Sequence, residues 1–443
     1  MRKSSIFFTG TLLTALAIGL GILLASSRKI NSDDITSSDR FSALASSVNS
    51  TDKRIKIAEA TIKAKPKQAN SYNQLCAALI QKARETGDFN WNARAEAALK
   101  KSLELNSNTE KENYDALRLQ ATLNLTYHRF AQALQTGQQM QKLRPNDHYV
   151  YGVLTDALVE LGRYSEAVEA ADKMSDLHPD ATSYARISYL RALHGYQDQA
   201  IEAMRLAVRS SSPSDHEGHA WYRVQLGNEL LNAGQLKEAG HEFETALQIF
   251  PDYYEGLAAQ ARLFIRLGDF EQAIIFYRRA QERVPLPDTV IALGDLYARQ
   301  GNNEKAQQQY ALLEAIERSG NSAYSPKLAL YLADHDLKLE EALTIAQRER
   351  ATRADIYTCD VLAWCLFKKG ELAAAKTAID EAQRLGTRDA RIYYHAGMIY
   401  QALKDTDQAA KYLNLALTTN PTFDVLQAEI AKQTLNTISK KTV

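Results

Sequence analysis

The prolines of this 443-residue chain keep a nearly constant spacing, which constrains the fold more than any other feature of the sequence. Five of them follow one another at steps of 34, 34, 38 and 34 residues: Pro145, Pro179, Pro213, Pro251 and Pro285. Pro421 comes 136 residues after Pro285, which is four further steps of 34. A proline ends a helix because its ring removes a hydrogen-bond donor and clashes with the preceding turn. We therefore predict a repeat protein with helical units of about 34 residues.

The segment from Trp221 to Pro251 shows what one unit contains. Its recurring positions are Leu226, Gly227, Leu230, Gly234, Ala239, Phe243 and Ala246. The first three share one face of a first helix, and the last three share one face of a second helix. Gly234 falls where the first helix must end and the chain must turn. Each unit is therefore predicted to be a hairpin of two antiparallel helices.

These columns resemble the tetratricopeptide repeat (TPR) family over residues 52–443. The resemblance implies an all-α fold, a right-handed superhelical solenoid of about ten helical hairpins. The columns fade at about 315–350, where we predict a degenerate unit, and a capping helix is expected at about 422–437. Ser183–Ala207, Val290–Tyr297 and Leu385–Tyr400 are also similar to exported or membrane-anchored bacterial TPR proteins without an assigned activity.

The N-terminus predicts export or membrane attachment. Arg2 and Lys3 precede an apolar stretch from Ile6 to Ala25. Residues 1–27 are thus either a signal peptide, cleaved near the small residues that end the stretch, or an N-terminal transmembrane anchor. Both alternatives place the repeats on the exported side, in the periplasm or cell envelope. The serine-rich residues 28–51 are expected to form a flexible linker to the solenoid at 52–443.

Composition and motifs argue against nucleic-acid binding and catalysis. The 53 basic residues equal the 53 acidic residues, whereas nucleic-acid binders carry a basic surplus. His216 and His219 are three residues apart instead of the four that a helical zinc motif requires. Asp334, His335 and Asp336 are consecutive and would diverge on a helix. We find no phosphate-binding loop or nucleophile elbow, so we predict no enzyme, no cofactor and no metal.

The resemblance implies that first helices line a concave face and bind extended peptides or partner helices. The positions projected onto that face as a partner-binding groove are Arg186, Trp221, Asn228, Arg262, Arg266, Asp295, Arg299 and Tyr394. The arginines suit a partner segment with acidic residues, unless they pair with acids of the same face. The predicted function is a non-enzymatic scaffold for a partner protein or peptide. The alternative is a permanent accessory subunit of a larger cell-envelope complex.

Overall fold

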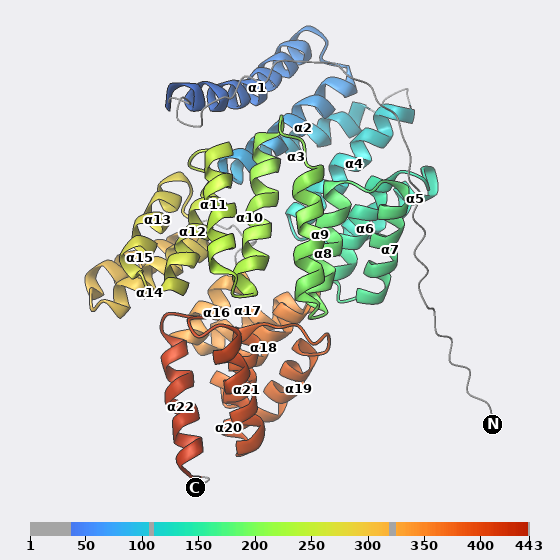
Figure 1. Cartoon of the computed structure of the whole chain (residues 1–443). Coiled ribbons are helices and arrows are strands. Elements are labelled where there is room, and N and C mark those ends of the chain that lie inside the picture. The colour runs from blue at the N-terminus through green and yellow to red at the C-terminus, as the bar shows by residue number, and fades with distance from the viewer. Residues whose placement is uncertain (1–36, 106–109, 319–324, 442–443) are drawn as a thin grey trace, which may run out of the picture. The chain divides into compact units, whose positions relative to one another are not determined.

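A computed structural model describes residues 37–105, 110–318 and 325–441 of the chain. These residues form 22 α-helices and no β-strand, which confirms the predicted all-α class. Twenty of the helices pack as ten successive antiparallel hairpins, and one further helix lies at each end of the array. Each hairpin packs against the next, so that the array is a superhelical solenoid (Figure 1). The contacts described below lie within the compact unit of residues 43–443.

The two helices of each hairpin are called here its first and second helix. The first helices are α2 (Ala69–Thr86), α4 (Glu110–Thr126), α6 (His148–Glu160), α8 (Ala181–Leu193), α10 (His216–Asn232), α12 (Tyr254–Leu267), α14 (Pro287–Arg299), α16 (Ser325–Asp334), α18 (Ile356–Lys368) and α20 (Ala390–Ala402). The second helices are α3 (Asn90–Leu105), α5 (Phe130–Leu143), α7 (Tyr164–Leu177), α9 (Gln197–Ser210), α11 (Leu236–Ile249), α13 (Phe270–Arg283), α15 (Asn303–Arg318), α17 (Leu339–Thr352), α19 (Leu372–Ala382) and α21 (Thr406–Thr419). The flanking helices are α1 (Ser37–Ala64) and α22 (Gln427–Lys441).

The regularly spaced prolines lie just after second helices. Pro145 follows the end of α5, Pro251 follows α11, and Pro421 follows α21. Pro66 stands in the same place after α1, so the end of α1 resembles a second helix. The proline spacing thus records the length of one hairpin, because each proline prevents a second helix from running on.

Small residues let the two helices of a hairpin approach closely. Gly227 on α10 faces the ring of Phe243 on α11, and a Cβ at Gly227 would lie 2.6 Å from Cδ1 of that ring. Gly294 on α14 stands in the same relation to Tyr310 on α15, 2.8 Å from its Cδ1. Ala239 is fully buried in the same hairpin as Gly227. Close packing of this kind leaves no room for an added methyl group.

The hairpin of α16 and α17 coincides with the stretch where the sequence columns fade. Its first helix has only 10 residues. Asp336 and Lys338 occupy the turn with φ of 54° and 41°, where most other hairpins place a glycine, although the turns at His128 and Lys404 also lack one. Left-handed backbone is costly for residues with a Cβ, so this turn is less favourable than its glycine-containing counterparts.

Hairpins that are far apart in sequence also touch. Three hydrogen bonds link Ala354 N–H to the Glu160 carbonyl (2.9 Å), Ile356 N–H to the Tyr164 hydroxyl (2.9 Å), and Thr387 Oγ1 to the Leu193 carbonyl. The partners in the last two bonds are 192 and 194 residues apart, which is more than five hairpins. In Figure 1 the orange and red helices of the last hairpins accordingly lie below the green helices of the middle hairpins. We call these the inter-turn contacts.

The ends of the array differ from the expected boundaries. Helix α1 begins at Ser37, inside the range predicted as a linker, and the rest of that prediction and residues 1–27 lie outside the described residues. Helix α22 begins at Gln427 because Asp424 Oδ1 accepts hydrogen bonds from the N–H groups of Leu426 and Gln427, as an N-cap does. No helix in the described part of the chain has the length and apolar character needed to cross a membrane.

Candidate functional site

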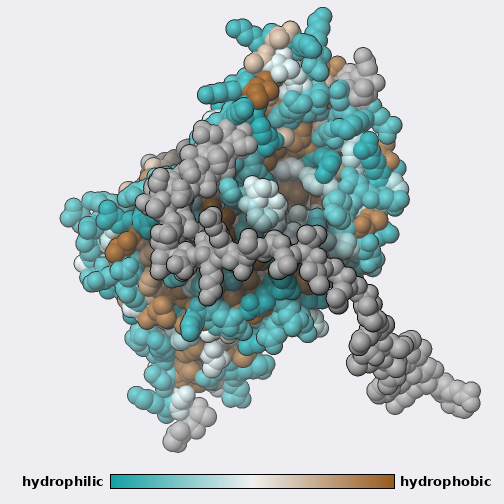
Figure 2. Space-filling model, turned by 45° about the horizontal axis from the view of Figure 1, so that its top comes forward, coloured by the Kyte–Doolittle hydropathy of each residue, from teal (hydrophilic) through white to brown (hydrophobic). Residues whose placement is uncertain are grey.

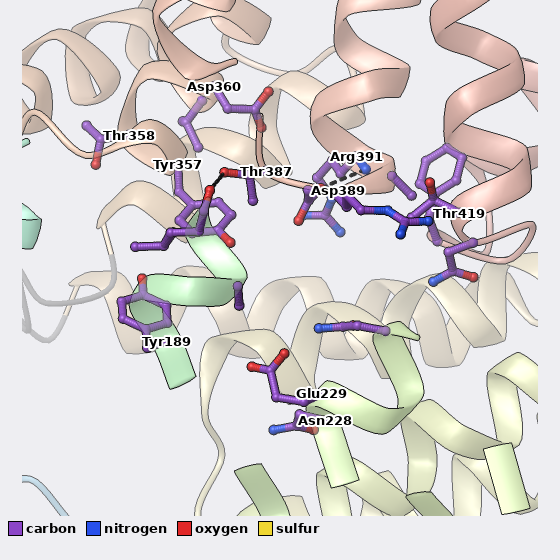
Figure 3. A pocket seen from close by; sticks show the side chains of 18 of the residues that line it. Tyr189, Asn228, Glu229, Tyr357, Thr358, Asp360, Thr387, Asp389, Arg391 and Thr419 are labelled. Atoms are coloured by element: carbon purple, nitrogen blue, oxygen red, sulfur yellow. Dashed lines mark hydrogen bonds between the residues drawn. The ribbon is translucent and has the colours of Figure 1, made fainter. Parts of the chain in front are cut away.

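Three adjoining cavities run along the inner side of the array, and we call them together the inner cleft. Their volumes are about 670, 800 and 560 Å³. The first shares Tyr189 and Gln225 with the second, and it shares Asn228 and Arg391 with the third. Figure 3 shows the first cavity, with Asn228 and Glu229 of the middle hairpins opposite Arg391 of the last hairpins. The inter-turn contacts therefore close a space that first helices line.

Six of the eight residues projected onto a groove line the inner cleft. They are Arg186 and Trp221 in one cavity, and Asn228, Arg262, Arg266 and Asp295 in another. That they bind a partner there stays a prediction. Among the six, Asp295 is 8% exposed, and its Oδ1 accepts hydrogen bonds from Tyr310 Oη at 2.8 Å and from His335 Nε2 at 3.0 Å. Because these bonds occupy the Asp295 carboxylate, the residue serves as a structural part of the cleft wall.

The two remaining residues do not line the cleft. Tyr394 is 1% exposed and packs against Trp364, and its hydroxyl donates to Gln427 Oε1 at 2.7 Å. Its place in the projected groove is wrong, because the face of α20 that carries it is covered by the chain that leads into α22. Arg299 is exposed, but its guanidinium donates to the Val425 carbonyl at 2.8 Å, so it anchors the same segment.

The four projected arginines all have acceptors within the chain. Arg186 forms a two-pronged pair with Asp156, at 2.8 and 2.6 Å. Arg262 donates to Asn228 Oδ1 at 2.9 Å. Arg266 donates to Asn420 and to the Thr419 carbonyl, 153 residues away. The arginines therefore do not form a free basic surface, and the alternative of pairing within the face describes them better.

Uncharged polar and aromatic side chains are prominent in the first cavity. Gln225, Asn228 and Asn232 follow one another at helical spacing along the cleft side of α10. Tyr189 and Tyr357 line the same cavity and keep 42% and 39% of their surface exposed. On the face shown in Figure 2, hydrophobic residues are scattered among hydrophilic ones. Tyr189 is not among the positions projected onto the groove, although it lies one helical turn after Arg186 and so on the same face of α8.

The C-terminal side of the cleft is acidic around one arginine. Burial and Asp424 raise the pKa of the Asp334 carboxyl to about 6, while Arg391 lowers it. Burial likewise raises the pKa of Asp389, which caps α20 by accepting from the Arg391 and Ile392 N–H groups. Arg391 Nη2 lies 3.7 Å from Asp424. Over the three cavities, eleven acidic and eight basic side chains line the cleft, so it presents mixed charge with a small acidic excess.

Two histidines in the C-terminal half of the array, His335 and His395, have structural partners. His335 contacts Asp295, whereas its neighbour Asp334 accepts from Trp364 Nε1 at 2.8 Å, so consecutive side chains diverge as expected. His395 is 1% exposed, stacks on Trp364 with ring centroids 4.1 Å apart, and lies 2.8 Å from Asp360. Burial among aromatic rings explains both positions without a catalytic role.

A second acidic group, at the contact of α10 with α12, gives a pH prediction. Burial and the neighbouring Glu217 raise the pKa of Glu255 to about 7 from its ordinary 4.5. The folded protein therefore binds more protons at Glu255 than the unfolded chain between these two pH values. The stability that this proton contributes is present below pH 4.5 and is lost as pH rises through about 7.

We expect Glu255→Gln to reduce this pH dependence. The melting temperature of the variant should fall less than that of the wild type between pH 5 and pH 8, by roughly 2 °C. Melting curves at the two pH values measure the difference. Glu244→Gln, which changes an exposed glutamate on α11, is the matched control. Identical slopes for wild type and Glu255→Gln would show that Glu255 does not titrate in this range.

Comparison with protein families identifies the repeats. Models described as tetratricopeptide repeat match residues 230–288 and residues 390–423. The first match covers α11, α12 and α13, and the second covers α20 and α21. The chain contains tetratricopeptide repeats. The second TPR match coincides with one observed hairpin, and its 34 residues, from 390 to 423, equal the proline spacing.

Curated relatives of this TPR protein match it at low identity. DnaJ homolog subfamily C member 3 of Rattus norvegicus is 24% identical over 197 residues, which are 41% of this chain. The match spans only 39% of the rat protein's length. The TPR repeat-containing protein YpiA of Bacillus subtilis is 23% identical over 315 residues, covering 70% of this chain and 72% of YpiA.

Two solved structures illustrate the similarity in three dimensions. PilW, a widely conserved type IV pilus biogenesis factor, aligns with 46% of this chain and 92% of its own at 17% identity and a TM-score of 0.39. The Cut9–Hcn1 structure of the APC/C aligns with 89% of this chain and 95% of that chain at 15% identity and a TM-score of 0.36.

Proposed function

We propose that this TPR protein is a non-enzymatic scaffold that holds an extended segment of a partner protein in the inner cleft. TPR arrays as a class support a role in protein interaction. The observation that carries the finer proposal is the pair of exposed tyrosines beside the amide side chains of α10. Tyr189 and Tyr357 offer rigid aromatic surface at low entropic cost, as the residues that dominate binding interfaces often do.

Amide side chains suit an extended peptide backbone. Each carries both a donor and an acceptor, so it pairs with a peptide N–H and C=O together. Gln225, Asn228 and Asn232 present such groups along one wall of the cavity. Asn228 already donates to Gln225 and accepts from Arg262, and it keeps a second N–H and a second lone pair for a ligand. Because the arginines have partners within the chain and the cleft has mixed charge, we propose a partner segment of polar, weakly charged composition in place of the acidic one.

A photo-crosslinking experiment in cells tests this proposal. A photo-reactive amino acid placed at residue 189 or 357 should crosslink a partner protein, whereas the same group at Tyr196 should not. Tyr196 is 58% exposed and lies outside the inner cleft, so it controls for exposure alone. Tyr189→Ala with Tyr357→Ala should lower capture of that partner at least about tenfold, the size of a hot-spot loss. Equal crosslinking from all three positions would contradict binding in the cleft.

The same preparation distinguishes a permanent subunit from a transient scaffold. A partner that elutes in moderate salt indicates a scaffold, and one that stays bound through high salt indicates an accessory subunit of a larger complex. We also propose, from the sequence of residues 1–27, that the repeats act on the exported side of a membrane. A mass measurement of the N-terminus of protein isolated from cells checks whether that segment is removed.

A further inference from the structure

Two histidines and an aspartate meet where the hairpin of α6 and α7 joins the hairpin of α8 and α9. His148 is the first residue of α6, His178 follows the end of α7, and Asp180 caps the start of α8. Nε2 of His148 lies 3.8 Å from Asp180 Oδ2, and Nε2 of His178 lies 4.0 Å from the same oxygen. One ligand atom from each residue lies within 4.8 Å of the other two.

The carboxylate is held in place by bonds that leave one oxygen directed at the imidazoles. Asp180 Oδ1 accepts from Thr182 Oγ1 at 2.7 Å and from the Ser183 N–H at 2.9 Å. Ser183 Oγ in turn accepts from the Asp180 N–H, which completes a capping box. Because the helix cap uses Oδ1, the orientation of Oδ2 toward the two histidines is fixed before any ion binds.

The two imidazoles are also positioned by the chain. Pro179 confines the preceding residue to extended backbone, and His178 has φ of −156° and ψ of 96°. The His148 and His178 rings meet edge to face, with centroids 4.6 Å apart. On its other side, His148 Nδ1 lies 3.9 Å from Asp147 Oδ1.

These distances are close to those of a metal centre. Imidazole nitrogen and carboxylate oxygen are common zinc ligands, with bonds of about 2.0–2.2 Å. In a tetrahedral site such bonds place neighbouring ligand atoms about 3.4 Å apart. The observed separations of 3.8 and 4.0 Å need only a small closing movement of two surface side chains. The His148, His178 and Asp180 side chains are 34%, 58% and 26% exposed, so water can reach a fourth position.

We propose that His148, His178 and Asp180 form a binding site for a divalent ion of the zinc type, which clips the two hairpins together. The three ligands come from the ends of three different helices, and they converge only when α6 and α7 are paired and the start of α8 packs beside them. An ion bound by all three therefore stabilises the folded junction over the unfolded chain. The site is separate from the inner cleft and does not depend on the proposed partner.

Calorimetric titration of the full chain with zinc chloride tests the site. We expect one Zn²⁺ per chain with a dissociation constant on the order of 10 µM or lower, and a higher melting temperature with zinc. His148→Ala, His178→Ala and Asp180→Asn should each weaken binding at least about tenfold and abolish the zinc-dependent rise in melting temperature. Asparagine keeps the cap of α8, so Asp180→Asn removes the charged ligand from a folded protein.

His216→Ala combined with His219→Ala is the matched control. These residues are also near one another on the first turn of α10, but His219 Nδ1 faces Ser211 Oγ at 2.5 Å. The control should bind Zn²⁺ as the wild type does. The proposal is overturned if the wild type shows no saturable binding below about 100 µM. It is equally overturned if the three ligand variants bind as tightly as the wild type.

Discussion

Gly162→Ala is expected to lower the free energy of unfolding by about 3 kcal/mol, because two independent costs meet at this position. Gly162 lies in the turn between α6 and α7 with φ of +70°, where a Cβ is strained. An added Cβ would also overlap the carbonyl oxygen of Ala354 and lie 3.0 Å from its carbonyl carbon. Backbone atoms cannot rotate away, so the two turns of the superhelix must separate there.

Gly234→Ala separates the cost of backbone strain from the cost of the steric clash. Gly234 occupies the corresponding turn between α10 and α11 with φ of +78°, but nothing lies within 4 Å of an added Cβ. This variant should lose only the conformational part, about 1 kcal/mol. Urea unfolding measures both, and small-angle X-ray scattering should show expansion for Gly162→Ala alone. Equal stabilities for the two variants would mean that the inter-turn contact at Ala354 contributes nothing.

Gly227→Ala should lower the free energy of unfolding by about 2 kcal/mol, although alanine is normally the better helix former. The new methyl group would overlap Cε1 of the Phe243 ring and lie 2.6 Å from Cδ1. Phe243 is fully buried, so its ring has no space to move into. Urea unfolding measures the lower free energy of unfolding. The destabilising contact lies between α10 and α11, the two helices of one hairpin.

A paired substitution locates this strain. Adding Phe243→Leu to Gly227→Ala replaces the clashing ring, so the two changes together should cost less than the sum of the separate changes. Gly240→Ala on α11 is the control, since an added Cβ would meet only the flexible end of Leu263 at 3.0 Å. If Gly227→Ala proves as stable as Gly240→Ala, the assigned packing of α10 on α11 is incorrect.

Local patterns made the fold and part of the cleft predictable. Proline and glycine act within a few residues of where they stand, so the ends of helices and the turns can be recognised from sequence. Helical periodicity then assigns faces, and Trp221 and Arg262, which it projects onto the inner side, line the inner cleft. Tyr394 was misplaced because its burial depends on the segment leading into α22 and on Gln427, which the repeat pattern does not include.

The sequence by itself determined the repeat length and the helical hairpins, since these follow from short-range sterics and periodicity, whereas which helix of each hairpin faces inward was implied by the resemblance to the TPR family. Only the tertiary structure decided which hairpins meet after more than five repeats. That meeting results from small rotations summed over many interfaces, and no single motif records the sum. The meeting of these hairpins pairs Arg266 with Asn420 and closes the inner cleft. It also places Gly162, which lies in a turn, against the backbone of Ala354. The convergence of His148, His178 and Asp180 was likewise visible only once α6, α7 and the start of α8 were packed together.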